Sequence, residues 1–504
     1  MCIVCGSGSA HLLRAIARTH AAPRPSASRF VAHVVAPPVM PPLDPASEAD
    51  LSGPADVILR GGPILTMSAA TPSAEAVAVR AGRIQAVGSE AAAYAHRGRL
   101  TRIVDLRGRA LLPGFVNAHW HLPFTLLCEW VDATGADSPA AALAALAEAA
   151  RGAAPGEWLV LGVSAGMAPA GAAVLDAAAP THPAVVADPD GAILAANTLA
   201  AAAGEGAAHI SALVPRLAAR FAGSAEPTQR RLTALLRQTA ALGVTCLRVC
   251  GLGTLSGAND LDLLRAVAEP SPPLRLRATL DAALHQEWSA LRLSPGFGDD
   301  AFRVDTLSIW FDPDAGAAPR LGADLRRARD AGWGVTVHAN DDAQVEQALA
   351  AFAGSGAAFD RRCGLECRRA PLAAQTVALD GLGLSLGLTA SHDPVPMDNA
   401  PSGGLSGVPV SLGLDAATGP SAPLRMVRNA EAGEFGVALA PVQALAAVTI
   451  DAAHRCGAGD ILGSIERGKY ADFAFLDSDP RGAGDYAAPR CVGTWVNGLE
   501  AFRA

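Results

Sequence analysis

The stretch GFVNAHWHLPF, residues 114–124, places His119 and His121 one residue apart with Trp120 between them. It follows RIVDLRGRALLP, residues 102–113, which is typical of extended chain. Because successive side chains of a strand point to opposite faces, the two histidines share one face and the tryptophan takes the other. We expect Trp120 to pack between this strand and helices. The histidine pair alone fits either a metal site or two hydrogen-bonded core histidines.

Size and composition exclude several classes of protein. The chain has 504 residues, is 50% hydrophobic and carries a formal charge of -8, so it can hold a large core and more than one domain. No long single-sign charge run is present, which argues against a nucleic-acid partner. The longest uncharged apolar stretch, residues 158–175, contains a proline and three glycines and indicates a buried strand and loop, with no membrane span. Nine cysteines favour reduced thiols in a cytoplasmic protein.

Both ends of the chain share one pattern, apart from a Pro/Ala-rich head. Residues 1–54 predict a flexible extension, although the opening C-x2-C also allows a zinc knuckle. Residues 55–112 alternate apolar and polar side chains between glycine-containing turns, and the pattern returns within residues 441–504 after a last helix. The sequence therefore predicts a small β-sandwich built from both chain ends.

The region between them has a different pattern. Within residues 113–440, Ala/Leu-rich helical windows alternate with short β-branched runs such as DTLSIWF, WGVTVHAND and GVPVSLGLD. This alternation predicts a parallel β/α sheet, and the number of units favours a closed barrel. The predicted fold class is α/β: a distorted TIM (β/α)8 barrel with the small β-sandwich beside it.

Function in such barrels gathers at the carboxyl ends of the strands. Besides the histidine pair, His338 ends the strand in GWGVTVHANDD, and Asp415 ends GVPVSLGLD. Each has a simpler explanation, since a lone histidine is often structural and an aspartate often caps a turn. Together, His119, His121, His338 and Asp415 form an N3O set that suits zinc or a similar divalent ion. Such an ion lowers the pKa of bound water to about 7, and Asp415 would carry the proton to a leaving nitrogen.

At this point the chain resembles the amidohydrolase superfamily, and within it the YtcJ-like branch that includes N-substituted formamide deformylases. The resemblance runs from about Ala55 to the C-terminus and rests on LLPGFVNAHWHL, GEWLVLG, GVTVHANDDAQVEQALAAF, GVPVSLGLDAATGPSAPL and DILGSIERGKYADFAFLDSDP. It implies the same barrel and β-sandwich, the four residues of the N3O set as metal ligands, and Asp415 with His338 as catalytic residues.

Two departures from the family concern the metal. Many relatives carry a carboxylated lysine on the fourth strand that bridges two ions, but here Ser308 lies near that position in DTLSIWFDPDAG. The chain's single lysine, Lys469, belongs to ERGKYADF in the sandwich, so one metal ion is expected unless Asp312 substitutes. On the sixth strand, LECRRAP has Glu366-Cys367 where the family has Glu-His. Cys367 is a candidate thiolate ligand for zinc, or an apolar filler.

A third departure concerns the substrate. Relatives have a histidine after the glycine of DGAILAANT, where this chain has Ala192. His392, in LTASHDP, is a candidate to compensate from another strand, although a surface or packing histidine is the simpler interpretation. The substrate pocket has therefore changed, and the substrates of relatives do not transfer.

The sequence predicts a hydrolase that uses one divalent ion, zinc before Mn²⁺ or Fe²⁺, to cleave a non-peptide C–N bond of the amide, N-acyl or formamide type. A ring deaminase with one metal is the alternative within enzymes, because NAHWHLPFTLL also resembles that branch. A degenerate member that only binds a small molecule is the alternative outside enzymes. The expected partner is a small-molecule substrate, with a homodimer as an expectation from relatives.

Overall fold

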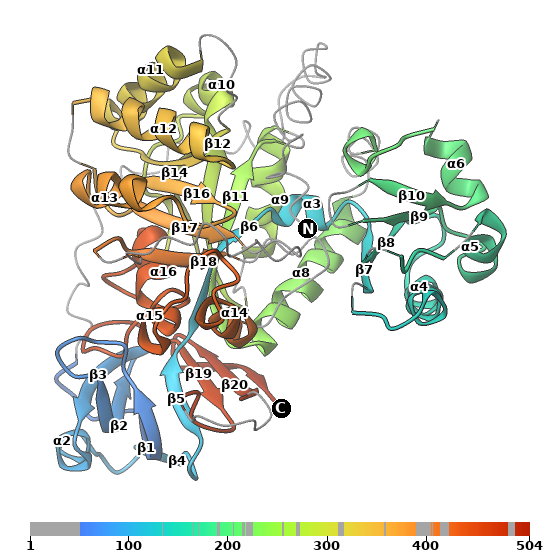
Figure 1. Cartoon of the computed structure of the whole chain (residues 1–504). Helices are drawn as coiled ribbons and strands as arrows, with labels where there is room; N and C mark the ends of the chain where they lie inside the picture. The colour runs from blue at the N-terminus through green and yellow to red at the C-terminus, as the bar shows by residue number, and fades with distance from the viewer. Residues whose placement is uncertain are drawn as a thin grey trace.

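The computed structural model describes residues 51–133, 135–164, 166–169, 171–188, 192–204, 206–213, 217, 225–254, 257–268, 273–310, 317–356, 359–389, 405, 407–413, 423–481 and 489–504. Of the sequence predictions, those on the head before residue 51, Asp312, His392 and Asp415 lie outside these ranges. Three bodies of secondary structure are visible in Figure 1: a barrel, a β domain below it and a separate sheet beside it.

The terminal β domain is one eight-stranded sheet that draws strands from both chain ends, where the sequence predicted a small β-sandwich. Its order is β21-β20-β19-β5-β1-β2-β3, and β4 also pairs with β1. The strands are β1 (Val57–Leu65), β2 (Ser73–Arg80), β3 (Arg83–Gly88), β4 (Arg102–Asp105), β5 (Ala110–Pro113), β19 (Phe473–Leu476), β20 (Cys491–Val496) and β21 (Leu499–Arg503). Side chains from both ends, such as Ile64, Val77, Phe473 and Trp495, share one buried core.

The barrel consists of eight parallel strands in the order β18-β17-β16-β15-β14-β12-β11-β6. They are β6 (Phe115–Trp120), β11 (Val244–Leu252), β12 (Arg275–Asp281), β14 (Phe302–Trp310), β15 (Gly334–His338), β16 (Gly364–Cys367), β17 (Ser385–Thr389) and β18 (Val410–Gly413). Strand β13 (Phe297–Gly298) pairs with β14 from outside. The predicted fold class, a distorted TIM barrel, is confirmed.

The barrel is nearly closed where β18 meets β6. A Cβ atom added to Gly413 would lie 2.2 Å from the Cβ of His119, so only glycine allows this approach. Against β11, strand β6 shifts register twice between Phe115 and Trp120, and these irregularities lie in the segment that carries the first histidine. Trp120 is buried in the main hydrophobic core and donates to Thr125 Oγ1 at 2.8 Å, away from the histidines, as predicted.

The region predicted as one barrel also contains a second sheet, which we call the insert. Its strands β7 (Glu129–Ala133), β8 (Leu159–Val163), β9 (Ala184–Ala187) and β10 (Ile193–Ala196) follow β6 and precede β11, in the order β10-β9-β8-β7. The first three are parallel and β10 is antiparallel. Because they are short apolar strands separated by helices, their pattern matches that of barrel units. The insert lies to one side of the barrel (Figure 1).

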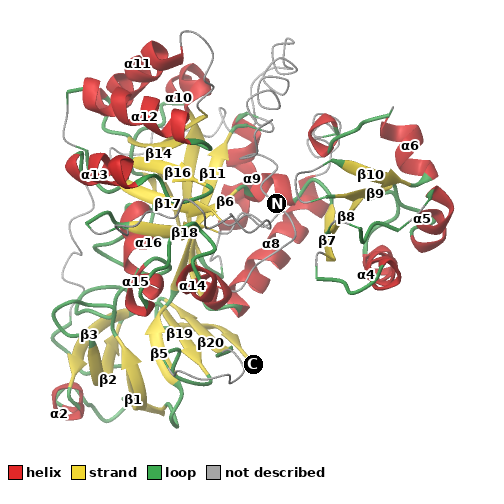
Figure 2. Cartoon of the chain, in the orientation of Figure 1, coloured by secondary structure: helices red, strands yellow, loops and turns green. Residues whose placement is uncertain are grey.

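Helices cover both the barrel and the insert (Figure 2). The insert carries α4 (Pro139–Gly152), α5 (Ala172–Ala178) and α6 (Thr198–Gly204), with η1 (Ile210–Ala212). The remaining helices are α2 (Glu90–Tyr94), α3 (Leu122–Thr125), α8 (Ala225–Ala241), α9 (Ala258–Ala268), η2 (Ala282–Leu284), α10 (His285–Ala290), α11 (Ala317–Asp330), α12 (Asp342–Gly354), α13 (Ala373–Gly381), α14 (Pro423–Glu431), α15 (Pro441–Ala446) and α16 (Ile450–Arg455). Within the described ranges, none of them combines the length and apolar character that crossing a bilayer requires.

A buried ion pair joins the terminal β domain to the barrel. Arg275, at the start of β12, donates from Nε to Asp472 Oδ2 at 2.8 Å and from Nη2 to Asp472 Oδ1 at 3.2 Å. The backbone N–H of Asn497 also donates to Asp472 Oδ1, at 2.7 Å. Both charged side chains are more than nine-tenths buried, at 6% and 4% exposure. The two bodies therefore share a charge pair that neither can satisfy alone.

The substitution Asp472→Asn should lower the free energy of unfolding by about 3–5 kcal/mol, because it leaves the buried Arg275 guanidinium without its counter-charge. Urea unfolding followed by circular dichroism measures this loss. The matched control is Asp479→Asn, whose partner Arg481 is 48% exposed, and its effect should stay below about 1 kcal/mol. Equal losses in the two variants would contradict the role given to the pair.

Candidate metal centre

The carboxyl ends of the parallel barrel strands bring together residues that are far apart in the sequence. His119 and His121 lie at the end of β6, His338 ends β15, and Glu366 lies near the end of β16. His338 and Glu366 are register partners on neighbouring strands. All four side chains are buried, and the three imidazole centroids lie between 4.6 and 6.1 Å apart.

The predicted histidine pair converges through one nitrogen of each ring. His119 Nε2 and His121 Nε2 are 3.0 Å apart. The other nitrogens have neighbours of their own: His119 Nδ1 lies 3.2 Å from Glu366 Oε1, and His121 Nδ1 lies 3.1 Å from the backbone oxygen of Cys250. A carboxylate or carbonyl on the far nitrogen is the usual arrangement for a histidine that binds a metal through the near one.

Glu366 is held by a buried set of polar groups inside the barrel. Thr389 Oγ1 donates to its Oε1 at 2.8 Å, and Arg455 Nη2 donates to its Oε2 at 2.9 Å. Arg248 Nη1 lies 3.8 Å from Oε2. Burial alone would raise the pKa of Glu366, but His119 and Arg455 outweigh burial and hold the pKa well below its ordinary value. Glu366 is therefore a charged carboxylate at neutral pH.

His338 has a different environment. The indole of Trp310, which ends β14, stacks on its imidazole with centroids 3.8 Å apart and planes 20° apart. Burial, reinforced by the neighbouring His119, lowers the pKa of His338 well below its ordinary value. At pH 7 the ring is therefore neutral, which is the form that binds a metal or accepts a proton.

A thiol also lies inside the barrel beside the histidines. Cys250, on β11, has its sulfur 4.0 Å from Arg248 Nη1. Burial would raise the pKa of this thiol, but His119 and Arg248 outweigh burial and bring the pKa to about 7. The two buried guanidiniums of Arg248 and Arg455 thus face Glu366 and an easily ionised thiol.

The structure brings together three of the five predicted metal ligands, His119, His121 and His338. It places Cys367 elsewhere: this side chain packs in the main hydrophobic core, and burial raises its pKa well above its ordinary value. Its neighbour Glu366 faces the histidines instead, because adjacent strand residues point to opposite faces. This placement favours the apolar filler over the ligand. Asp415 lies outside the described residues.

The structure also locates two of the family departures. Ser308, near the position of the relatives' lysine, is buried and shares a hydrogen bond of 2.6 Å with Thr279 Oγ1. Lys469 donates from Nζ to the Gly459 oxygen at 2.6 Å and to Ser464 Oγ at 2.7 Å, outside the barrel strands. Ala192 lies in the insert, where its backbone bridges His209.

Sequence reasoning missed Glu366, Arg248 and Arg455 as residues of this centre. A signal for Glu366 exists in GLEC (364–367), where Leu365 and Cys367 are apolar and the glutamate shares its face with a glycine. Applying the two-residue period of a strand to these four letters points Glu366 inward. Arg455 carries no comparable signal, because it lies beside other polar residues in the helix IDAAHR, whereas Arg248 is the one charged residue of the strand VTCLRVCGL.

The donor set fits one side of a divalent ion. The Nε2 atoms of His119 and His121 converge, and the Nδ1 atom of each ring faces an oxygen of the protein. The neutral imidazole of His338 is adjacent. Within the ranges that the structure describes, no group of three or more His, Cys, Asp or Glu side chains has the spacing of a complete metal site.

Asp281 is a further buried carboxylate at the same end of the barrel, where it closes β12. It accepts from the backbone N–H of Ala283 at 2.9 Å. Burial raises its pKa to about 6, against the hydrogen bonds from Ala283 and Thr254, which favour the charged form. Perturbed carboxyl groups at strand ends are typical of functional sites.

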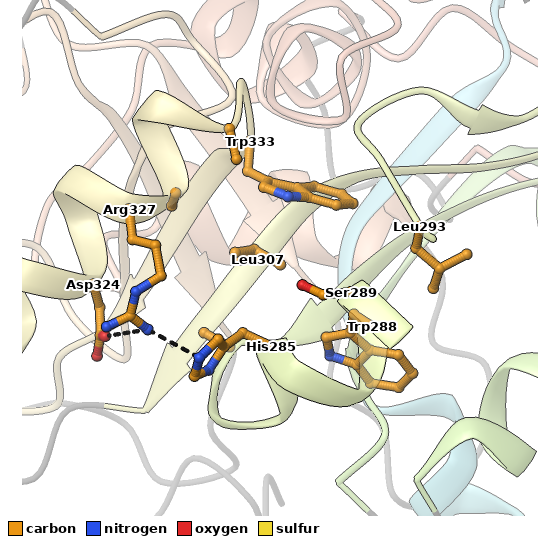
Figure 3. A pocket seen from close by; sticks show the side chains of 11 residues that line it. His285, Trp288, Ser289, Leu293, Leu307, Asp324, Arg327 and Trp333 are labelled. Carbon is orange, nitrogen blue, oxygen red and sulfur yellow. Dashed lines mark hydrogen bonds and ion pairs between the residues drawn. The ribbon is translucent and has the colours of Figure 1, made fainter. Parts of the chain in front are cut away.

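A pocket on the outside of the barrel has no contact with this centre. It contains about 530 Å³ of empty space, part of it open to solvent, between α10 and α11. Trp288, Leu293, Leu307 and Trp333 line it, and Arg327 at its rim contacts Asp324 and His285 (Figure 3). Since the paired rim charges are already satisfied and no histidine of the centre lines it, we do not assign the chemistry to this pocket.

The raised pKa of Asp281 predicts a specific pH dependence. Its folded pKa of about 6 exceeds the unfolded value of about 3.9, so its contribution to stability is fully present below pH 4 and is lost as the pH rises through 6. Between pH 4 and 7.5 the wild type should therefore lose about 2–3 kcal/mol relative to Asp281→Asn. Urea unfolding at both pH values measures the difference, with the partly exposed Asp324→Asn as control. Parallel pH profiles for wild type and Asp281→Asn would refute the assignment.

Known proteins resemble this chain both in sequence and in fold. A sequence model described as the Amidohydrolase family matches residues 102–500. An imidazolonepropionase of Geobacillus thermodenitrificans is 37% identical over 73 residues, which cover 14% of this chain and 17% of that protein. The curated relatives that match do so over short segments, each between 12% and 20% of the relative's length.

Solved structures match over most of the chain at low identity. An uncharacterized metal-dependent hydrolase from Pyrococcus horikoshii has a TM-score of 0.66 at 18% identity and covers 85% of this chain and 98% of its own. An adenosine deaminase from Xanthomonas campestris with bound zinc has a TM-score of 0.51 at 18% identity, covering 89% of this chain and 93% of its own. These likenesses confirm the fold. Since the family model spans the whole barrel and well over half of the chain, the chain belongs to the amidohydrolase family.

Proposed function

We propose that this protein is a metal-dependent hydrolase that cleaves a non-peptide C–N bond of the amide, N-acyl or formamide type. One observation carries the proposal: His119 Nε2 and His121 Nε2 converge to 3.0 Å while Glu366 and a backbone carbonyl hold the opposite nitrogens. Because both far nitrogens face oxygen acceptors, each neutral ring carries its proton on Nδ1, and neither Nε2 then has a hydrogen to donate to the other. Membership of the amidohydrolase family supports the same chemistry.

We propose His119, His121, His338 and Asp415 as the residues that hold one ion, with zinc before Mn²⁺ or Fe²⁺ because the donor set is N3O. When bound, a divalent ion polarises a carbonyl oxygen and lowers the pKa of its water to about 7, so that hydroxide is available at neutral pH. One ion is expected because Ser308 replaces the bridging lysine and Lys469 lies outside the barrel strands.

The chain's own residues orient the metal ligands and transfer the proton. Glu366 Oε1 lies 3.2 Å from His119 Nδ1, and the Cys250 carbonyl accepts from His121 Nδ1, so both rings present an Nε2 lone pair to the same point. His338 is neutral at pH 7 and takes part without a charge that would repel a cation. Asp415 is the proposed proton carrier, which takes a proton from the attacking water and delivers it to the leaving nitrogen.

Two alternatives have observations in their favour. A ring deaminase needs one metal and no lysine, and Ser308 in place of that lysine satisfies this condition. A degenerate protein that only binds a small molecule is favoured by the position of Cys367, which leaves the sixth strand without a histidine or thiolate toward the site.

Substrate class is tested directly with a panel of formamides, N-acyl amines, aminopyrimidines and aminopurines assayed with zinc-loaded protein. Release of formate or another carboxylate with an amine is the expected result, because the proposed proton transfer ends on a leaving amine. Release of ammonia from the ring compounds alone would establish the deaminase instead. Turnover of none of them, with zinc bound, would favour the binding protein.

The metal itself is tested by elemental analysis of the native protein, where we expect close to one zinc ion per chain. The variant His121→Ala should lose the metal, because one of the two converging nitrogens is removed. The matched variant Cys367→Ala should retain it, since that thiol lies in the hydrophobic core. Two ions per chain, or loss of metal in Cys367→Ala with retention in His121→Ala, would contradict the assignment.

A further inference from the structure

Trp310 contacts two of the three histidines of the candidate metal centre. It is the register partner of His338 on the neighbouring strand, and the two rings stack with centroids 3.8 Å apart. The same indole lies 5.1 Å from the His121 ring, with the planes tilted by 38°. One side chain that carries no metal-binding atom therefore lies against both rings.

A glycine of the barrel leaves the space that this indole occupies. Gly251, at the end of β11, has a φ of +68°, and an added Cβ would lie 2.9 Å from Trp310 Cζ2 and 3.7 Å from His121 Nδ1. A side chain at this position would both strain the backbone and displace the indole. Gly251 thus leaves room for the contact between Trp310 and His121, next to the Cys250 carbonyl that holds His121.

On its other side, Trp310 packs against the insert. It joins a hydrophobic cluster, which we call the inner core, made of Cys128, Trp158, Val160, Val185, Ala187, Ala200, Ile210, Leu213 and Leu217. The opposite face of the inserted sheet has its own cluster, the outer core, which includes Leu146, Leu161, Val163 and Leu175. Only the inner core has Trp310 among the residues packed against it.

We propose that Trp310 is a positioning residue that couples the insert to the metal centre. The second side-chain torsion of histidine is broad, so the ring plane of a ligand must be set by its neighbours. Stacking with the indole sets the plane of His338 and limits that of His121, and the inner core in turn holds the indole. The insert is therefore part of the active-site structure. This inference rests on the proposed function for the presence of a metal.

The physical consequence concerns metal affinity. An imidazole that must be reoriented on binding costs affinity, whereas a ring already held in place does not. Loss of the neighbour that orients a ligand typically weakens metal binding by about 10–100-fold. The inner core holds the indole in place. A substitution that opens a cavity in the inner core should therefore also reduce metal affinity, although the inner core belongs to a different sheet from the histidines.

The experiment measures Co²⁺ binding to metal-stripped full-length protein by chelator competition, and records the visible absorption of bound Co²⁺, which reports ligand geometry. Trp310→Ala should weaken binding by about tenfold or more and alter the absorption. Trp310→Phe keeps a flat ring over His338 and should stay within about threefold of wild type. Thermal unfolding confirms that each variant is folded.

The matched pair Val160→Ala and Val163→Ala isolates the insert. Both valines lie on β8 and are fully buried, at 1% and 0% exposure, but Val160 belongs to the inner core and Val163 to the outer core. Val160→Ala should weaken Co²⁺ binding by roughly threefold to tenfold, a part of the Trp310 effect, while Val163→Ala leaves it unchanged at a similar loss of thermal stability. Combined with Trp310→Ala, the Val160 variant should add nothing.

Three results would overturn the inference. Wild-type affinity in Trp310→Ala removes the positioning role, and equal affinities in Val160→Ala and Val163→Ala remove the coupling to the insert. Both outcomes leave the proposed metal centre intact. A wild-type protein that binds no Co²⁺ contradicts the metal centre itself, and the coupling with it.

Discussion

The centre of this molecule depends on one buried carboxylate. Glu366 is 3% exposed and charged, a state that is costly in a protein interior unless the charge is paired and hydrogen-bonded. Four elements meet this requirement together: α16 supplies Arg455, β17 supplies Thr389, β11 supplies Arg248, and β6 supplies His119. A Cβ on Gly387 would lie 2.4 Å from Glu366 Oε2, so β17 also provides the space. The position of His119 follows from this carboxylate.

The other buried polar groups of the barrel also form a set of balanced charges. Two guanidiniums are buried beside one carboxylate, and the thiol of Cys250, with a pKa of about 7, is the neighbouring group able to supply a second negative charge. The interior of the barrel is thus organised around compensated charges rather than around apolar packing alone. Breaking one partner leaves another charge buried, which explains why such groups act as a unit.

Much of the fold and part of the site were predictable from local pattern. The period of two placed His119 and His121 on one face, and the alternation of helices and strands gave the barrel, because both depend on neighbouring residues only. The insert was not predicted, since β7, β8 and β9 have the short apolar runs of barrel strands and only their pairing partners distinguish them. The same limit applies to Trp310, whose contacts with His338 and the inner core are tertiary.

Cys367 shows a different limit of prediction from residue type. Its chemistry as a zinc ligand was attractive, but the choice between Cys367 and Glu366 is decided by strand geometry, and β16 points the carboxylate inward. Residue type alone therefore does not decide which member of the pair contacts the histidines. The residues that orient a site can be less conspicuous in a sequence than those with ligand chemistry.

The most direct test of the central claim is anomalous diffraction at the zinc absorption edge from crystals of the full-length protein grown with zinc. The account predicts one anomalous peak about 2.0–2.1 Å from His119 Nε2 and His121 Nε2, with His338 beside it. Absence of a peak at the two converging nitrogens, with zinc bound elsewhere or nowhere, would contradict the account.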